Sequence, residues 1–211
     1  MSSRPVPPSG TLSAPDAPPG GRRSYALEGV SQWLTSQERL QIIDLGGINQ
    51  QNVDYVTGMG HRLYSDDLLR TYEAFFQPEE LRAPQLSAER VEEFLDHCFD
   101  LPDQSADGAL VWDTLQFLPA TVAQAVLARI HRILAPDSPV LALFHSESAG
   151  PMAPPQQCRI LDLRHIQLAP RGEKRTIVPY NPRAIERFFQ RFRTLKFFLT
   201  RDNLQEVIAR R

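Results

Sequence analysis

A carboxylate and two glycines follow an apolar run near the start of the chain. Leu40–Leu45 is apolar apart from Gln41 and Asp44, and Gly46 and Gly47 come directly after it. A carboxylate at a strand end suits ribose hydroxyls or an ammonium group and repels phosphate, and glycine has no Cβ to keep a ligand from the backbone. The run therefore indicates a site for a nucleoside-type ligand, with a plain tight turn between strand and helix as the alternative.

Other cofactor and metal patterns are missing from the sequence. It holds neither the G-x-G-x-x-G fingerprint, which aims a helix N-terminus at phosphates, nor a Walker loop. A nicotinamide-dependent enzyme is therefore the least favoured function. Cys98 and Cys158 lie far apart, and together with His97 they form no set at metal-binding spacing, so we predict neither a metal site nor a disulfide.

The apolar runs predict the sheet that must position these groups. Runs at 40–45, 62–65, 108–112 and 140–144 predict strands, and 119–134 has the apolar spacing of a helix. A strand, a helix and a strand joined in this way predict parallel pairing with a right-handed connection. In an open parallel sheet, ligands bind beyond the carboxyl ends of the strands, where the strand order reverses.

The polar residues at those strand ends are therefore the candidate site residues. Asp44 stands at the end of the first predicted strand, and Asp66 and Asp67 follow the second. Asp113 follows the third strand and His145 the fourth.

Other elements are predicted around this core. The spacing of apolar residues from Tyr25 predicts a helix laid against the domain, and the Pro-rich stretch 150–157 predicts a loop over the active face. Asn181-Pro182 predicts a helix start. Segments 194–200 and 204–209 predict a terminal antiparallel hairpin.

Length and composition predict one water-soluble domain. Of the 211 residues, 42% are hydrophobic and 23% charged, and the net charge of −2 gives no strong nucleic-acid signal. Residues 1–22, rich in Pro, Ser, Gly and Ala, predict a disordered tail, which leaves 23–211 as the folded domain. The sequence shows no secretory signal and no apolar stretch near the ~20 residues that span a bilayer, so we expect a cytoplasmic protein without membrane contact.

Taken together, the segments resemble class I S-adenosylmethionine (SAM) methyltransferases. Ile42–Gly46 looks like the first SAM-binding motif, and Asp100–Leu118 resembles the segment leading into and past the family's fourth strand. Leu127–Ser138 is similar to the helix and turn before the fifth strand, and the terminal hairpin fits the last strands. The resemblance covers about residues 25–211. It implies a three-layer, Rossmann-like α/β methyltransferase sheet, mostly parallel with an antiparallel C-terminal hairpin.

The same resemblance implies SAM as the cofactor and gives roles to the first two strand ends. Asp44, Gly46 and Gly47 would line the methionine end of SAM. Asp66, in preference to Asp67, would hold the ribose hydroxyls. The alternative for the two adjacent acids is a helix start favoured by the helix dipole.

It also gives roles to residues around the third predicted strand. Asp100 and Leu101 would lie near the adenine, and Trp112 and Asp113 would border the place where methyl donor and acceptor meet. For Trp112 the alternative is core packing at a strand end.

The glycine turn departs from the family pattern. Ile48 and Gln50 replace the later glycines of Asp-x-Gly-x-Gly-x-Gly, so either Asn49, Gln51 or Asn52 helps to bind the cofactor, or SAM binding is weakened or lost. A related set of bacterial proteins with Asp-Leu-Gly followed by a polar, Asn-containing helix start shares this form. We therefore place the chain in a variant bacterial subgroup.

The function expected from the resemblance is SAM-dependent methyl transfer to an unidentified acceptor. Asp113 and His145 are the candidate general bases, although a His at a strand end also serves as a structural hydrogen-bonding group. The competing hypothesis is a non-catalytic, methyltransferase-like binding or scaffold protein. No motif identifies the acceptor or the oligomeric state.

Overall fold

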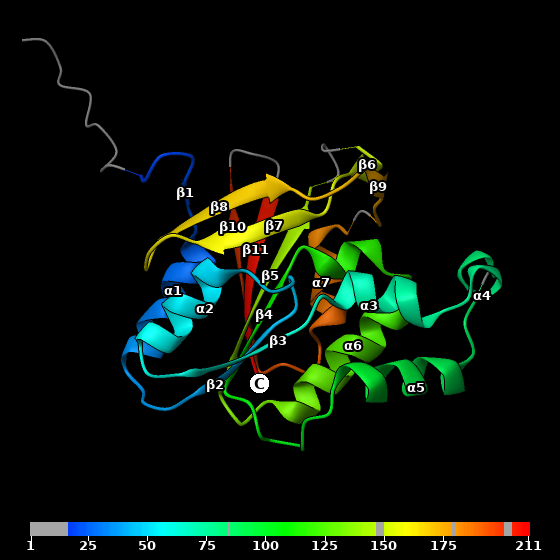
Figure 1. Cartoon of the computed structure of the whole chain (residues 1–211), viewed down its shortest axis with the longest axis horizontal. Helices are drawn as coiled ribbons and strands as arrows, with labels where there is room; N and C mark the ends of the chain where they lie inside the picture. The colour runs from blue at the N-terminus through cyan, green and yellow to red at the C-terminus, as the bar shows by residue number, and fades with distance from the viewer. Residues whose placement is uncertain (1–16, 84, 147–149, 179, 201–203) are drawn as a thin grey trace, which may run out of the picture.

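The chain forms one main sheet of six strands, in the order β10-β11-β5-β4-β2-β3 (Figure 1). This computed structural model describes residues 17–83, 85–146, 150–178, 180–200 and 204–211. The strands of the main sheet are β2 (Gln41–Asp44), β3 (Arg62–Ser65), β4 (Gly108–Trp112), β5 (Pro139–His145), β10 (Thr194–Leu199) and β11 (Leu204–Arg210).

Pairing in this sheet confirms the predicted arrangement. β2 pairs in parallel with β3 on one side and with β4 on the other, and β4 pairs in parallel with β5. β11 lies antiparallel between β5 and β10. The chain leaves β2 for β3 and returns to β4 on the opposite side, so the strand order reverses at β2, where parallel sheets place their ligands.

Helices cover both faces of the sheet, which gives three layers (Figure 1). One face carries α1 (Tyr25–Thr35) and α2 (Gln50–Gly58). The other face carries α3 (Leu68–Phe75), α5 (Ala88–Cys98), α6 (Ala120–Ile133) and α7 (Pro182–Phe188), with the short α4 (Pro78–Arg82) between α3 and α5. None of the described helices is long and apolar enough to cross a membrane.

Strand β4 packs against the helices on both faces of the sheet. Its side chains alternate, so Ala109 and Val111 pack on the α5–α6 side while Leu110 and Trp112 pack on the α1–α2 side. All five residues of the strand are buried. A continuous apolar run is therefore what this central strand requires.

Short polar side chains start five of the helices. The side chains of Ser24, Asn49, Asp67, Ser87 and Asn181 each accept a hydrogen bond from a backbone N–H three residues further on. These N-caps satisfy donors that the first helical turn leaves unpaired. The helix start predicted at Asn181-Pro182 is confirmed.

Two small sheets were not predicted from the sequence. One has the order β1-β8-β7 and the other pairs β6 with β9. Their strands are β1 (Arg22–Arg23), β6 (Met152–Ala153), β7 (Gln156–Ile160), β8 (His165–Pro170) and β9 (Arg175–Thr176). The prediction of a loop over 150–157 is therefore wrong for β6 and for the start of β7. Pro154 and Pro155 fall between these two strands, where no ladder N–H is needed.

The start of the folded part is held by a buried acid on β11. Arg22 Nη2 donates to Glu206 Oε1 at 2.7 Å, and Glu206 Oε2 accepts from Ser24 Oγ at 3.0 Å and from Ala26 N at 2.9 Å. Arg22, expected in the disordered tail, instead belongs to β1. The predicted disorder of residues 1–16 lies outside the described residues.

Candidate active site

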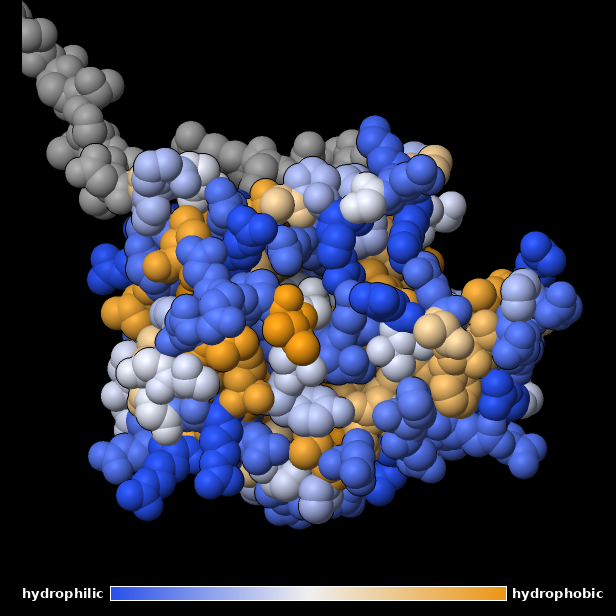
Figure 2. Space-filling view, in the orientation of Figure 1, coloured by the Kyte–Doolittle hydropathy of each residue, from blue (hydrophilic) through white to orange (hydrophobic). Residues whose placement is uncertain are grey.

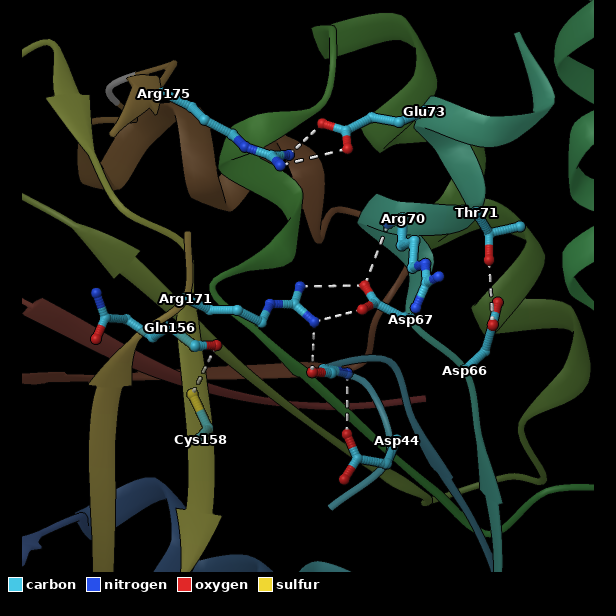
Figure 3. Close-up of polar contacts among 11 residues, drawn as sticks. Asp44, Asp66, Asp67, Arg70, Thr71, Glu73, Gln156, Cys158, Arg171 and Arg175 are labelled. Carbon is cyan, nitrogen blue, oxygen red and sulfur yellow. Dashed lines mark hydrogen bonds and ion pairs between the residues drawn. The ribbon is translucent and has the colours of Figure 1, made fainter. Parts of the chain in front are cut away.

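A pocket of about 340 Å³ opens at the carboxyl ends of β2 and β3, beside the reversal of strand order. This volume is within the range of small-molecule sites. The β2 and β3 ends contribute Gly46, Gly47, Ile48, Ser65, Asp66 and Asp67 to its lining, and α3 contributes Arg70 and Thr71. Residues 156–171, which hold β7 and β8 and are called the β7–β8 segment below, contribute Gln157 and Arg171. Figure 3 shows the polar side chains around this space.

Asp44 lies behind the glycine turn and does not line the pocket. Its Oδ1 accepts hydrogen bonds from Gly46 N at 3.0 Å and from Trp112 Nε1 at 2.7 Å, and its Oδ2 accepts from Asn52 Nδ2 at 2.8 Å. The residue is 1% exposed, and this burial raises the pKa of its carboxyl, against the lowering effect of the three donors. Asp44 therefore shapes the turn from within.

Trp112 closes the gap between the ends of β4 and β2. A Cβ at Gly46 would lie 2.5 Å from Trp112 Cδ1, so only glycine permits this contact. Trp112 itself has a φ of 55°, in the left-handed region that bulky residues rarely adopt, and the β4–β5 register shifts between Leu110 and Trp112. The indole is thus both core packing and a support for the turn.

The second glycine of the turn opens toward the pocket. Gly47 has a φ of 86°, and its N–H donates to Asp66 O at 3.1 Å. A Cβ there would meet Arg171 Nη1 at 2.9 Å and Asp67 Oδ2 at 3.2 Å. A side chain at this position would fill space in the pocket, which the glycine leaves free.

Asn49 and Asn52 hold the neighbouring elements and are absent from the pocket lining. Asn49 caps α2, and its Nδ2 donates to Cys158 O at 3.3 Å. Asn52 also donates to Cys158 O, at 3.1 Å, and its Oδ1 accepts from Ile160 N at 2.8 Å. Both amides therefore fasten β7 to the start of α2.

The substituted positions of the turn do not block the pocket. Ile48 is 74% exposed and stands at the rim, and Gln50 begins α2 with its side chain bonded to Asp54. The face shown in Figure 2 is mostly hydrophilic, with apolar residues in small separate patches. The loss of the later glycines therefore leaves the space beside Gly46 and Gly47 open.

The last residue of β3, Ser65, and the two acids that follow it have different surroundings. Asp67 caps α3 and forms an ion pair with Arg171, whereas Asp66 Oδ1 accepts only from Thr71 Oγ1, at 3.2 Å, among the contacts of the described residues. Ser65 Oγ is buried and has no hydrogen-bond partner there. An unpaired buried hydroxyl is costly, so its place on the pocket wall favours a ligand that supplies a partner.

Asp100 and Leu101 lie between α5 and β4, outside this lining. Asp100 is exposed, and Leu101 packs against the core on the α5–α6 side. Tyr64 of β3 contacts the end of the preceding helix, because its hydroxyl donates to Cys98 O of α5 at 2.8 Å. The structure thus does not bring the pair expected near adenine to the pocket wall.

A second polar group stands at the ends of β4 and β5. His145 Nε2 lies 3.7 Å from Asp113 Oδ2, which accepts from Gln156 N at 3.0 Å. Gln116 Oε1 accepts from His145 N at 2.9 Å. Among the described residues, the buried atoms His145 Nε2, Gln116 Nε2 and Tyr180 OH have no hydrogen-bond partner. Asp113 and His145 are therefore neighbours, as expected of two adjacent strand ends.

Sequence reasoning missed the part of the site that comes from the β7–β8 segment. Gln157 and Arg171 follow no motif and lie more than 100 residues from the glycine turn. The only signal is the Pro-rich stretch 150–157, predicted to cross the active face, which does supply Gln157. Among the described residues, no group of three or more His, Cys, Asp and Glu side chains could hold a metal ion.

Comparisons with known proteins find likeness at the level of structure alone. No family model and no curated protein matches the sequence. A putative type 11 methyltransferase from Sulfolobus solfataricus is 18% identical, with 87% of this chain and 90% of that chain covered and a TM-score of 0.50. A SAM-dependent methyltransferase from Archaeoglobus fulgidus is 12% identical, with coverage of 88% and 94% and a TM-score of 0.50.

Such identities are evidence for the fold and not for the reaction. The likeness extends over 87% and 88% of this chain, which holds the mostly parallel sheet, the helices on both of its faces and the antiparallel terminal hairpin. The predicted fold class is therefore confirmed, and the chain has the three-layer, Rossmann-like α/β fold of SAM-dependent methyltransferases.

Proposed function

We propose that the chain binds SAM in the pocket at the ends of β2 and β3 and transfers its methyl group to an acceptor. The observation that carries this proposal is the pocket itself, which combines the bare backbone of Gly46 and Gly47 with the carboxylate of Asp66 at the reversal of strand order. Ser65 Oγ, buried without a partner among the described residues on the same wall, supports a ligand with hydroxyl or amine groups. The fold shared with solved methyltransferases agrees with this use.

The residues divide into those that touch the cofactor and those that shape its site. Asp66, with one carboxylate oxygen bonded only to Thr71 among the described residues, would hold the ribose hydroxyls. Gly46 and Gly47 would lie along the methionine end. For Asp44 we propose an indirect part, because Gly46, Asn52 and Trp112 already occupy its two oxygens.

The acceptor would lie near the ends of β4 and β5. Asp113 and His145 stand together there, and Nε2 of His145 is buried without a hydrogen-bond partner among the described residues. When bound, the sulfonium cofactor supplies the methyl group, and alignment of the acceptor accounts for much of the rate of such an in-line displacement. His145 would take the acceptor's proton where one must leave, and Asp113 would stabilise the resulting charge. The variant bacterial subgroup and the cytoplasmic location stay predictions from the sequence.

A non-catalytic binding protein is the second candidate, and one observation favours it. Asp44, in the turn that resembles the first SAM motif, is 1% exposed and bonded on both oxygens, so it offers no open group to a ligand. The buried, hydrogen-bonded Asp44 carboxyl would then serve only to stabilise the turn between β2 and α2.

Calorimetric titration of the full chain with SAM and with S-adenosylhomocysteine tests the proposal. We expect binding to the wild type, a loss of affinity in Asp66→Ala, and unchanged affinity in Asp54→Ala, which removes an exposed acid of α2. No binding to folded protein at millimolar ligand would contradict the proposal. Binding of NADH in place of SAM would overturn the assignment of SAM as the cofactor. Binding without methyl transfer to any member of an acceptor panel would favour the non-catalytic protein.

A further inference from the structure

Arg171, which follows β8, reaches the pocket from the opposite wall to Asp66. Its guanidinium forms a two-pronged ion pair with Asp67, in which Nη2 donates to Oδ1 at 3.1 Å and Nη1 donates to Oδ2 (Figure 3). Nη1 also donates to Gly46 O at 3.4 Å. The Arg171 backbone is held by a hydrogen bond from its N–H to Pro155 O at 2.7 Å. The cation is thereby fixed over the glycine turn.

The guanidinium keeps donors to spare. It has five N–H groups, and the bonds to Asp67 and Gly46 use three of them. Among the contacts of the described residues, one N–H of Nη2 and the N–H of Nε are left, on a side chain that is 32% exposed and lines the pocket. Asp67 is itself immobilised because its Oδ1 accepts from Arg70 N at the start of α3.

Charges of both signs meet in this small space. Asp66 and Asp67 bring two carboxylates, and Arg70 and Arg171 bring two guanidiniums. A ligand that carries an ammonium and a carboxylate on one short tail matches such a lining better than a ligand of one sign. Among the two cations, Arg70 is exposed, whereas Arg171 is partly buried against Gly46 and Gly47. Contacts of Arg171 are therefore less screened by water.

We propose that Arg171 binds the α-carboxylate of the cofactor's methionine tail, an inference that rests on the proposed SAM site. With the ribose at Asp66, the tail runs along Gly46 and Gly47, and the spare donors of Arg171 lie on that path. A guanidinium offers a carboxylate two parallel charge-assisted bonds, which lysine cannot reproduce. The β7–β8 segment then serves to select ligands that carry the amino-acid tail.

Two ligands of known chemistry separate this role from a general effect on the pocket. S-Adenosylhomocysteine carries the amino-acid tail, and 5′-methylthioadenosine keeps the nucleoside and the sulfur without it. Calorimetry of the full chain would compare the wild type with Arg171→Gln, Arg171→Lys and the control Arg62→Gln, at an exposed arginine of β3 outside the pocket lining. Circular dichroism and thermal melting would confirm that each variant is folded.

We expect Arg171→Gln to lower the affinity for S-adenosylhomocysteine about 10- to 100-fold, because the variant loses hydrogen bonds to a charged group. Its affinity for 5′-methylthioadenosine should stay at the wild-type value. Arg171→Lys should recover part of the loss, and Arg62→Gln should change neither affinity by more than about twofold.

Other outcomes overturn the inference in distinguishable ways. An equal loss for both ligands in folded Arg171→Gln would mean that the residue only shapes the pocket, and no loss would mean that it does not contact the tail. If the wild type binds neither ligand, the proposed SAM site fails and this inference fails with it. Binding of 5′-methylthioadenosine in preference to S-adenosylhomocysteine by the wild type would overturn the role of Arg171 alone.

Discussion

Trp112 Nε1 donates a hydrogen bond of 2.7 Å to Asp44 Oδ1 and so joins the carboxyl ends of β4 and β2. Trp112→Phe keeps a ring in this space and removes the donor. We expect it to lower the free energy of unfolding by about 1–3 kcal/mol, because a buried acceptor loses a hydrogen-bond partner. Urea unfolding measures the change. Trp33→Phe, at a half-buried ring of α1, is the control, and an equal effect there would contradict this account.

Gly46 is predicted to be intolerant of even a methyl group. Gly46→Ala places a Cβ 2.5 Å from Trp112 Cδ1, and the indole is fixed by its bond to Asp44. Overpacking of this kind costs about 1–3 kcal/mol. Thermal or urea unfolding should show the loss, whereas Gly58→Ala, with nothing within 4 Å of the new Cβ, should be neutral or slightly stabilising. Wild-type stability of Gly46→Ala would disprove the close contact.

Burial of Asp44 should give the stability a characteristic pH dependence. Its pKa in the folded state is raised above the ordinary value of 3.8 by burial. At pH values between the ordinary pKa, which applies to the unfolded state, and the raised pKa of the folded state, the folded state binds more protons than the unfolded state. The contribution of Asp44 to stability therefore decreases as pH rises through this range. Asp44→Asn removes this contribution.

The measurement is a series of urea unfolding curves of wild type and Asp44→Asn from acid to neutral pH. The difference in unfolding free energy, wild type minus variant, should decrease with rising pH. A constant difference would show that the folded pKa is not raised. The Asp44→Asn variant should also lose one hydrogen bond at all pH values. The reason is that Ile160 N fixes the orientation of Asn52, whose amide NH₂ then points at the NH₂ group introduced by the substitution.

Glu206 should be the acid whose removal most weakens the N-terminal part of the domain. Glu206→Ala leaves Arg22, Ser24 and Ala26 N without their buried acceptor. Breaking a buried pair from one side costs about 3–5 kcal/mol. Glu28→Ala, which removes a more exposed acid paired with Arg23, should change unfolding little. Similar unfolding curves for the two variants would contradict the importance of burial.

Tyr180 and Tyr64 form a matched pair for testing unpartnered hydroxyls. Tyr180 OH is buried without a partner among the described residues, and burial raises its pKa to about 12, so it stays protonated at neutral pH. Tyr180→Phe should therefore leave stability unchanged or raise it. Tyr64→Phe loses the bond to Cys98 O and should cost about 1 kcal/mol. A clear loss in Tyr180→Phe would reveal a partner for its hydroxyl.

Local chemistry explains why much of the sheet and its helices could be predicted. The runs that became β2, β4 and β5 are largely apolar because these strands lie inside the sheet and are covered on both faces. The helix start at Asn181 was visible because a side-chain cap acts within three residues. These signals are short in range, so the sequence displays them directly.

The β7–β8 segment shows where such reasoning stops. Its strands are short, lie next to prolines and depend on pairing with Arg22 and with each other, and no local pattern encodes that pairing. For the same reason the sequence could not show that Arg171 meets Asp67, 104 residues away.

Asp44 and the two glycines after it also combine features set by the local sequence with features set by the tertiary structure. Local signals were enough to place Asp44, Gly46 and Gly47 at the end of a buried strand, because apolar runs and glycines mark strand ends within a few residues. Which of them face a ligand depends on elements that pack there from elsewhere in the chain. Trp112 and Asn52 form hydrogen bonds with the Asp44 carboxyl and bury it, while Asp66 and Arg171 line the same pocket as Gly47. Exposure and hydrogen bonding depend on such neighbours, which are distant in sequence and close in space.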